Sequence, residues 1–321
     1  MVVIKKAIVC YFDILGFRSL VKNKSRKKRI EISKKLDYSI QKALTVFGID
    51  KQNEKSKDAD WKIRVFSDCI CLAKPLSDIG IGICLSAISE FIQILMTDNI
   101  LIRGGVEIGE YIESEFILFS QAQVNAYELE SEKAIYPRVI ISKNIIEYIK
   151  KINDDGLRLM IKAYVIEDDL ECFFINYLEF DEEDGIISGH SFFYEQKKKI
   201  ENILASTKIE DIKKKYMWLA TVHNWAIRQA AKTIKLAGID EDNIWSFNLL
   251  LIKNVDIEFG FHCLIEDDNS FNEYYNIKDK IKYYESYFGN INNIDWIKKW
   301  PHASSEDDEE EPDREDDINL F

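Results

Sequence analysis

The sequence predicts an α+β fold in which an antiparallel sheet, built in the order strand–helix–strand–strand–helix–strand, packs against helices. An apolar run at residues 7–12 has the pattern of a buried strand, and it ends at Asp13. Further along, the segment 62–73 contains two strand-like halves with only Ser67 and Asp68 between them, which is the spacing of a tight hairpin. Apolar residues at helical spacing separate these strands. The order is that of a ferredoxin-like βαββαβ sheet with helices on one face.

The other elements follow from the same periodicities. Helices are predicted over residues 25–47, 78–97, 121–132 and 144–152. Strands are predicted over residues 101–109, 116–119, 139–141, 160–165 and 172–180. Later in the chain the pattern predicts helices over 191–204, 209–237 and 274–288, and strands over 247–255 and 257–264. We therefore expect three parts, which are a core domain over 1–180, a C-terminal elaboration packed on it over 181–303, and an acidic disordered tail over 304–321.

Composition places the chain among globular proteins and limits its partners. Hydrophobic residues make up 46% of the 321 residues, which is enough for a sizeable core. Much of the net charge of −13 comes from residues 306–317, which hold ten acids and one arginine. Because no basic surface rich in aromatic residues emerges, we do not expect nucleic-acid binding. The six cysteines show no zinc spacing, and we see neither a signal peptide nor a membrane span, so we expect a cytoplasmic protein with reduced thiols.

Asp13 and Asp68 are the first candidates for chemistry. If the first strand and the hairpin lie side by side, both carboxylates stand at the same edge of one sheet. There they repel each other unless a proton or a cation lies between them. Oxygen ligands on a rigid sheet suit Mg²⁺ or Mn²⁺, which fill their remaining positions with phosphate oxygens. The alternative is that Asp13 caps a helix and Asp68 is a turn residue, and spacing alone leaves both interpretations open.

Three motifs near the N-terminus resemble the catalytic domain of class III nucleotidyl cyclases. They are FDILGF at 12–17, RVFSDCICL at 64–72 and LIRGGVEIG at 101–109. They stand in the order in which that family carries them. AYELE at 126–130 and YPRV at 136–139 resemble a divergent bacterial branch, the pyrimidine nucleotide cyclases of Pycsar antiphage systems. The resemblance covers residues 1–180 and extends to KYMWLATVHN at 215–224.

The resemblance implies a two-metal site with substrate contacts around it. Asp13 and Asp68 would bind both of two Mn²⁺ or Mg²⁺ ions, and the carbonyl of Ile14 would contribute to one of them. Arg103 matches the phosphate-contacting arginine of the family and would act in catalysis, although a solvated strand-end residue is the simpler alternative. The further substrate-binding candidates are Phe12, Arg64 and Arg138.

Arg64 bears on which base is bound. It occupies the place of the lysine that reads the purine ring in the family, unless it is an ordinary strand residue. Arginine offers a planar fork of donors where lysine offers a point charge. Such a fork matches the acceptor-rich edge of uracil or cytosine, which favours a pyrimidine substrate.

One pair of family residues is missing. In purine cyclases an asparagine and an arginine, four residues apart, stabilise the transition state on the helix that matches 121–132. One register places Val124 and Glu128 there, and the other places Asn125 and Leu129. Neither register keeps the arginine, so another cation substitutes, or the enzyme is slower, or it is inactive.

We therefore expect a homodimer with composite active sites that converts UTP, or CTP in second place, into the 3′,5′-cyclic nucleotide and pyrophosphate. The resemblance implies a role in bacterial antiphage defence, in which a separate effector protein responds to the cyclic nucleotide. One alternative is a purine cyclase of the same fold that uses ATP or GTP. The other is a degenerate module that binds a nucleotide or a partner without catalysis.

Overall fold

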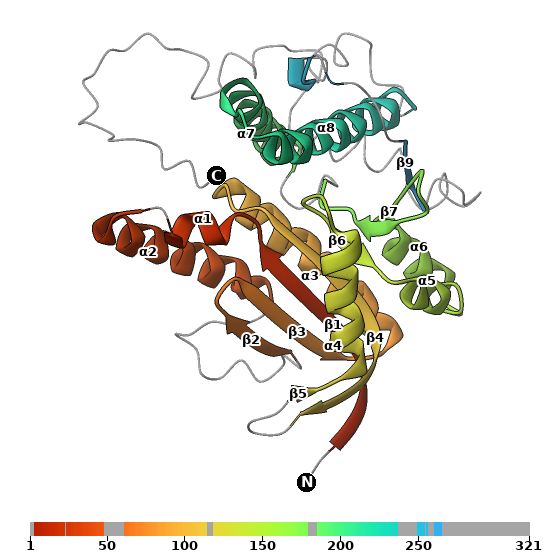
Figure 1. The fold of residues 1–321 in the computed structure, drawn as a ribbon. Helices are drawn as coiled ribbons and strands as arrows, with labels where there is room; N and C mark the ends of the chain where they lie inside the picture. The colour runs from red at the N-terminus through yellow and green to blue at the C-terminus, as the bar shows by residue number, and fades with distance from the viewer. Residues whose placement is uncertain are drawn as a thin grey trace.

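One mixed sheet runs through the part of the chain that the computed structural model describes, which is residues 3–22, 24–47, 61–113, 118–178, 185–236, 249–253, 255 and 260–264 (Figure 1). The strands are β1 (Val3–Ile14), β2 (Lys62–Phe66), β3 (Cys69–Pro75), β4 (Ile102–Glu113), β5 (Leu118–Phe119), β6 (Val139–Ile141), β7 (Val165–Asp168), β8 (Phe173–Ile175) and β9 (Phe261–Cys263). The helices are α1 (Phe17–Lys22), α2 (Arg26–Leu44), α3 (Asp78–Thr97), α4 (Gln121–Glu128), α5 (Lys143–Ile149), α6 (Asp155–Ala163), α7 (Gly185–Ser206) and α8 (Glu210–Leu236). A short helical turn, η1 (Thr45–Phe47), follows α2, and a π-helical turn, η2 (Leu129–Lys133), follows α4.

The four strands of the first half confirm the predicted α+β, ferredoxin-like arrangement. The sheet begins in the order β2-β3-β1-β4, and each neighbouring pair is antiparallel. This is the order that a βαββαβ chain adopts. The hairpin turn falls at Ser67 and Asp68, as predicted. Helix α3 has the predicted bounds, and the side chain of Ser77 begins it by accepting a hydrogen bond from the N–H of Gly80 at 3.0 Å.

Helices cover both faces of this sheet, whereas helices on one face were predicted, because α4 packs on the face opposite α2 and α3. Because successive residues of a strand point to opposite faces, Phe12 of β1 enters the main core, where it packs on Phe91 of α3. On the other face, Ala7 and Val9 form a second, smaller cluster with Ala122 of α4. The aspartate at the end of β1 therefore stands on the α4 face, and α2 and α3 cover the opposite one.

Two glycines of the LIRGGVEIG motif allow α4 to lie directly on β4. A Cβ atom at Gly105 would collide with the carbonyl oxygen of Ala126, and one at Gly109 would lie 3.2 Å from Cβ of Ala122. A larger side chain at either glycine would push the helix off the strand. The glycines of the motif thus place α4 beside the end of β1.

The sheet continues beyond these four strands. β6 pairs in parallel with β4, and β8, β7 and β9 follow it. The strand predicted over 160–165 is wrong for most of its length, because α6 extends to Ala163 and β7 begins at Val165. Asp154 caps this helix by accepting a hydrogen bond from the N–H of Leu157 at 2.9 Å. A short apolar run does not distinguish such a helix from a strand.

α7 and α8 lie side by side at the end of the molecule toward which β1 runs (Figure 1). They confirm the helices predicted over 191–204 and 209–237, although α7 begins earlier than expected. Of the strand predicted over 247–255, residues 249–250 are helical. The helix predicted over 274–288 and the tail over 304–321 lie outside the described residues.

One helix of the described residues, α3, is long and apolar enough to cross a membrane by length and composition. Its mean hydropathy is 1.9, and 67% of the window that meets this criterion is buried inside the protein. The sequence analysis found no such span.

Candidate functional site

Two separate segments bring Asp13 and Asp68 together at one edge of the sheet. Asp13 stands one residue before the end of β1 and pairs in register with Cys69 of β3. The N–H of Ile14 donates to the carbonyl oxygen of Asp68 at 3.0 Å, which ties the hairpin turn to the end of β1. One possible ligand atom from each of Asp13, Asp68 and Cys69 lies within 4.8 Å of the other two. The three side chains therefore form a group that a single metal ion can bridge.

The donor set of this group fits a hard divalent cation. Asp13 and Asp68 offer carboxylate oxygens, which Mg²⁺ and Mn²⁺ prefer. The sulfur of Cys69 accepts a hydrogen bond from the hydroxyl of Tyr11 at 2.8 Å. Burial raises the pKa of the Cys69 thiol, so the thiol stays protonated and neutral at pH 7. The two carboxylates are thus the charged ligands of the group.

Arg103 and Glu130 complete the site. Arg103 of β4 pairs in register with Asp13, and its Nε donates to Oδ2 of Asp13 at 3.1 Å. The same Nε lies 2.7 Å from Oε1 of Glu130, whose side chain is only 3% exposed. This contact is an ion pair, and Oε1 accepts no hydrogen bond within the part of the chain that the structure describes. Arg103 therefore stands between two carboxylates, one on β1 and one on η2.

Sequence reasoning missed Glu130. It ends the AYELE motif, which was singled out only for its resemblance. The π-helical turn after α4 presents this residue to Arg103, and neither periodicity nor spacing predicts such a turn. A charged residue at a buried position of an otherwise amphipathic helix was the one available signal.

The site holds more negative than positive charge. Burial raises the pKa of Asp13 on balance, against the lowering effect of Arg103, and the nearby charge of Asp68 raises it further. Burial also raises the pKa of Glu130, again against the effect of Arg103. The site thus holds three carboxyl groups beside one arginine, and a cation bound at this edge would relieve the repulsion between the carboxylates.

Arg64 lies on the face of the sheet that holds the aspartates. Tyr11 pairs in register with Cys71, and Cys71 pairs with Arg64, so these three side chains share one face of the sheet. Tyr11 precedes Asp13 by two residues on β1, so its side chain lies on the same face as that of Asp13. Arg64 is exposed. Tyr127 of α4 contacts Tyr11 edge to face, with ring centroids 5.4 Å apart. Arg64 and Tyr127 are thus both exposed on the face of the sheet that carries Asp13.

Phe12 and Arg138 do not join this group. The side chain of Phe12 is fully buried on the opposite face of the sheet, so a contact with substrate would require the core to open. Nη1 of Arg138 donates to Oδ2 of Asp168 at 2.6 Å, and both side chains are buried. The guanidinium group also lies over three aromatic rings. Its surroundings are those of a structural ion pair, and they give no support to the predicted phosphate contact.

Helix α4 is the helix on which the family carries its asparagine–arginine pair. In neither of the two registers do its side chains replace that pair. Val124 and Glu128 are exposed, whereas Leu129 packs against the core. Asn125 accepts a hydrogen bond from Gln121 on the same helix at 2.8 Å. The sequence of α4 contains no arginine, so any cation that replaces it comes from elsewhere.

No family model matches the sequence, and no curated protein matches it. Among solved structures, a class III adenylyl cyclase-like ATP-binding protein from Pseudomonas aeruginosa is similar, with 10% identity and a TM-score of 0.34 over 44% of this chain and 34% of that one. Two structures of a bacterial light-regulated adenylyl cyclase have 11% and 10% identity and TM-scores of 0.38 and 0.37. Each covers 61% of this chain, and the aligned parts are 58% and 59% of theirs. The chain thus spans less than two thirds of each of these structures. At these identities and TM-scores we draw no conclusion about this protein from the similarity.

Proposed function

We propose that this protein is a metal-dependent nucleotide cyclase that converts a pyrimidine nucleoside triphosphate, UTP first and CTP second, into the 3′,5′-cyclic nucleotide and pyrophosphate. The observation that carries the proposal is the convergence of Asp13, Asp68 and Arg103 at one edge of a ferredoxin-like sheet. The carboxylates suit a divalent metal, and the arginine suits phosphate oxygens. The FDILGF, RVFSDCICL and LIRGGVEIG motifs, which contain these three residues, support the same reaction.

The chain would contribute mainly position and charge. The ribose 3′-oxygen attacks the α-phosphorus of its own triphosphate, and pyrophosphate leaves. Mn²⁺ or Mg²⁺, when bound, would lower the pKa of the 3′-hydroxyl and neutralise the phosphates. Asp13 and Asp68 would hold the ions, with the carbonyl of Ile14 beside them. Each of these groups stands on a rigid strand or on the turn tied to it, so little reordering would be needed.

Arg103 would bind phosphate with the end of its guanidinium group. Its Nε faces Asp13 and Glu130, whereas its two Nη groups make no hydrogen bond within the described ranges. Two parallel donors of this kind match two phosphate oxygens. Glu130 would act as a positioning residue, because its ion pair fixes the direction of the Arg103 side chain.

The pyrimidine preference rests on Arg64. A purine site would pair a lysine here with a carboxylate in the stretch 117–120, and the sequence has no acid there. The donors of Arg64 match the carbonyls of uracil or O2 and N3 of cytosine. A site built from donors rejects a base that offers donors in return, because buried polar groups would be left unpaired. Guanine also carries an acceptor edge, which makes GTP the strongest purine competitor.

We further infer a C2 homodimer with composite sites, in which the aspartates of one subunit face Arg64 of the other. Phe66 at the tip of the hairpin is 83% exposed, and Val124 and Tyr127 on α4 are 51% and 49% exposed. Large apolar side chains beside a charged site favour cover by a second copy of the chain. Mixing inactive Asp13→Ala and Arg64→Ala subunits should then restore one intact site per mixed dimer. If mixed dimers form and stay inactive, the site is built within one chain.

The same proposal includes a cytoplasmic signalling role in antiphage defence, where a separate effector protein responds to the cyclic nucleotide. The support for it is the AYELE and YPRV resemblance. A second candidate function is a degenerate nucleotide-binding module. It is favoured by the absence of the asparagine–arginine pair, and by the hydrogen bond that already engages Asp13 with Arg103.

One assay tests these functions together. Purified protein is incubated with equimolar ATP, GTP, CTP and UTP and Mn²⁺, and cyclic products are identified by mass spectrometry. Asp68→Asn is the test variant, and Asp37→Asn, an exposed aspartate on α2, is its matched control. We expect cyclic UMP from the wild type and the control, and none from Asp68→Asn. Dominant cyclic AMP or GMP would overturn the pyrimidine preference, cyclic CMP only the ranking, and no product from folded protein would favour the non-catalytic module.

A further inference from the structure

Lys215 lies on the face of helix α8 that packs against the rest of the protein. Residues three and four apart share one face of a helix, so Lys215 lies on the face that also carries Trp218 and Leu219, which are 2% and 1% exposed. Lys213 and Lys214 on the same helix are exposed, whereas Lys215 is half-buried. A lysine on the buried face of a helix is uncommon unless its charge has a partner.

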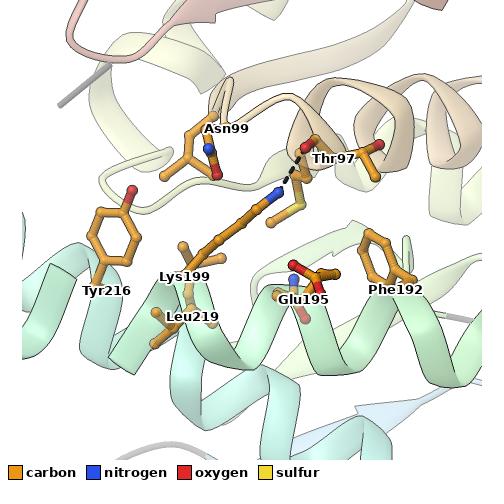
Figure 2. Close-up of a pocket in the computed structure, with 11 residues that line it drawn as sticks. Thr97, Asn99, Phe192, Glu195, Lys199, Tyr216 and Leu219 are labelled. Atoms are coloured by element: carbon orange, nitrogen blue, oxygen red, sulfur yellow. Dashed lines mark hydrogen bonds between the residues drawn. The ribbon is translucent and has the colours of Figure 1, made fainter. Parts of the chain in front are cut away.

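The contacts of α8 place this face at the edge of the sheet that holds the aspartates. Tyr216 lines a pocket together with Asn99 and Leu101, which lead into the start of β4 (Figure 2). Trp218 stacks on Tyr136, just before β6, with ring centroids 5.4 Å apart and planes 4° from parallel. β4 and β6 are parallel neighbours, and β1 runs antiparallel to β4. The starts of β4 and β6 therefore meet the end of β1 at one edge, and α8 contacts both.

The charge of Lys215 acts on the site. Burial raises the pKa of Asp13, and the positive charges of Arg103 and Lys215 both act to lower it. The face of α8 that carries Lys215 is also the face from which Trp218 stacks on Tyr136, at the edge of the sheet where β1 ends.

We propose that Lys215 contacts a phosphate group of the bound triphosphate, and that α8 thereby supplies a positive charge in place of the arginine that α4 lacks. The inference rests on the proposed function in so far as the ligand is a nucleoside triphosphate. An ammonium group is a compact point charge that binds phosphate oxygens without a fixed geometry. The C-terminal half of the chain would then be part of the active site and not only a support for it.

The test compares Lys215→Met with Lys214→Met. Both variants remove one charge and keep an unbranched side chain, but Lys215 is half-buried on the face that carries Trp218, whereas Lys214 is exposed. Binding of inorganic tripolyphosphate premixed with Mn²⁺ is measured by calorimetry, and KM and kcat are measured for the preferred nucleotide. Since a hydrogen bond to a charged group is worth about 1.5–3 kcal/mol, Lys215→Met should weaken tripolyphosphate binding and raise KM by roughly ten- to a hundredfold. Lys214→Met should behave as the wild type.

The outcomes separate this inference from the proposed function. If the wild type makes no cyclic product but Lys215→Met still loses tripolyphosphate affinity, the phosphate contact stands and the cyclase function falls. If Lys215→Met and Lys214→Met bind tripolyphosphate equally well, or if the wild type does not bind it at all, the phosphate contact is wrong.

A measurement on the wild type tests the same proposal without a substitution, in case Lys215→Met does not fold. Acetylation of lysine side chains is followed by mass spectrometry with and without Mn²⁺ and tripolyphosphate. Tripolyphosphate should slow the acetylation of Lys215 and leave that of Lys214 unchanged. Equal rates at Lys215 with and without tripolyphosphate would contradict the proposal.

Discussion

Two arginine–carboxylate pairs on the same sheet differ in almost every physical respect. Arg138 and Asp168 are both buried, and Oδ1 of Asp168 accepts two further hydrogen bonds from the N–H groups of Leu170 and Cys172, at 3.0 and 2.9 Å. The two charges are thus paired and both oxygens of Asp168 are satisfied, whereas Nε of Arg138 has no hydrogen-bond partner within the described chain. Arg103 is partly exposed and contacts the carboxylates of Asp13 and Glu130. Oε1 of Glu130 accepts no hydrogen bond within the described chain.

The difference separates a closed ion pair from an open group of charges. In the closed pair the charges cancel and both carboxylate oxygens are satisfied, which suits a role in holding β6 and β7 in place. An open group with surplus negative charge is unfavourable by itself, and such groups are typical of sites that bind a cation. Both arginines were candidates in the sequence, and only their surroundings separate them.

The largest expected effect falls on the open site. Asp13→Asn keeps the shape of the side chain but removes a charged metal ligand, so cyclic nucleotide formation should fall by a factor of at least about 1,000, which corresponds to about 4 kcal/mol. Thermal stability without metal should stay the same or rise, because repulsion at the site is reduced. Activity and melting curves measured on the same preparation check both parts. Normal activity with normal melting would remove Asp13 from the metal site.

The second effect falls on the closed pair and concerns stability. Arg138→Met leaves Asp168 buried without its cation, so the free energy of unfolding should drop by about 3–5 kcal/mol. The matched change at the open site, Arg103→Met, should cost less, because Arg103 and Asp13 are partly exposed and only Glu130 is left buried without its cation. Urea denaturation measures both. Equal losses at the two sites would contradict the distinction between them.

A third prediction concerns the closed region of α8, where His223 is buried. Its ring nitrogens lie 2.7 Å from Oε1 of Gln196 and 2.9 Å from the carbonyl oxygen of Leu250. Burial lowers the pKa of His223 to about 4. The unfolded chain, with an ordinary histidine pKa, therefore binds the proton more tightly, and stability is present above about pH 6.5 and lost as the pH falls toward 4.

In full, this loss should amount to about 3.5 kcal/mol, from a shift of about 2.5 pKa units at about 1.4 kcal/mol each. Urea denaturation between pH 7 and pH 4 should show that His223→Gln loses this part of the pH dependence. His262→Gln, which replaces an exposed histidine, is the control and should keep it. A wild-type slope in His223→Gln would show that other groups cause the loss.

The smallest effect is the response to metal. Ligand that binds only the folded state stabilises it by about 2.7 kcal/mol at a hundred times the Kd. Mn²⁺ should therefore raise the melting temperature of the wild type and of Arg138→Met, but not that of Asp13→Asn. Calorimetric titration with Mn²⁺ gives the Kd needed to choose the concentration. A full response in Asp13→Asn would place the metal elsewhere.

The sequence alone determined the core fold and half of the site. Alternating and helical apolar patterns set the order of strands and helices, because burial of one face dictates those periods. Ser67 and Asp68 between two strand-like halves fixed the hairpin and the register of β2 on β3. These are local signals, each carried by neighbouring residues, and the structure confirms the strand order that they predicted.

Only the tertiary structure decided which distant side chains meet. Glu130 reaches Arg103 through a π-helical turn, and Lys215 approaches the same edge because α8 packs across it. Arg138 forms a buried pair with Asp168, thirty residues later in the chain, and the structure does not bring it to Asp13 and Asp68. Such contacts depend on packing between elements far apart in sequence, and no periodicity or spacing encodes them. The charge balance of a site, which separates a ligand-binding group from a structural pair, is therefore a property of the folded chain.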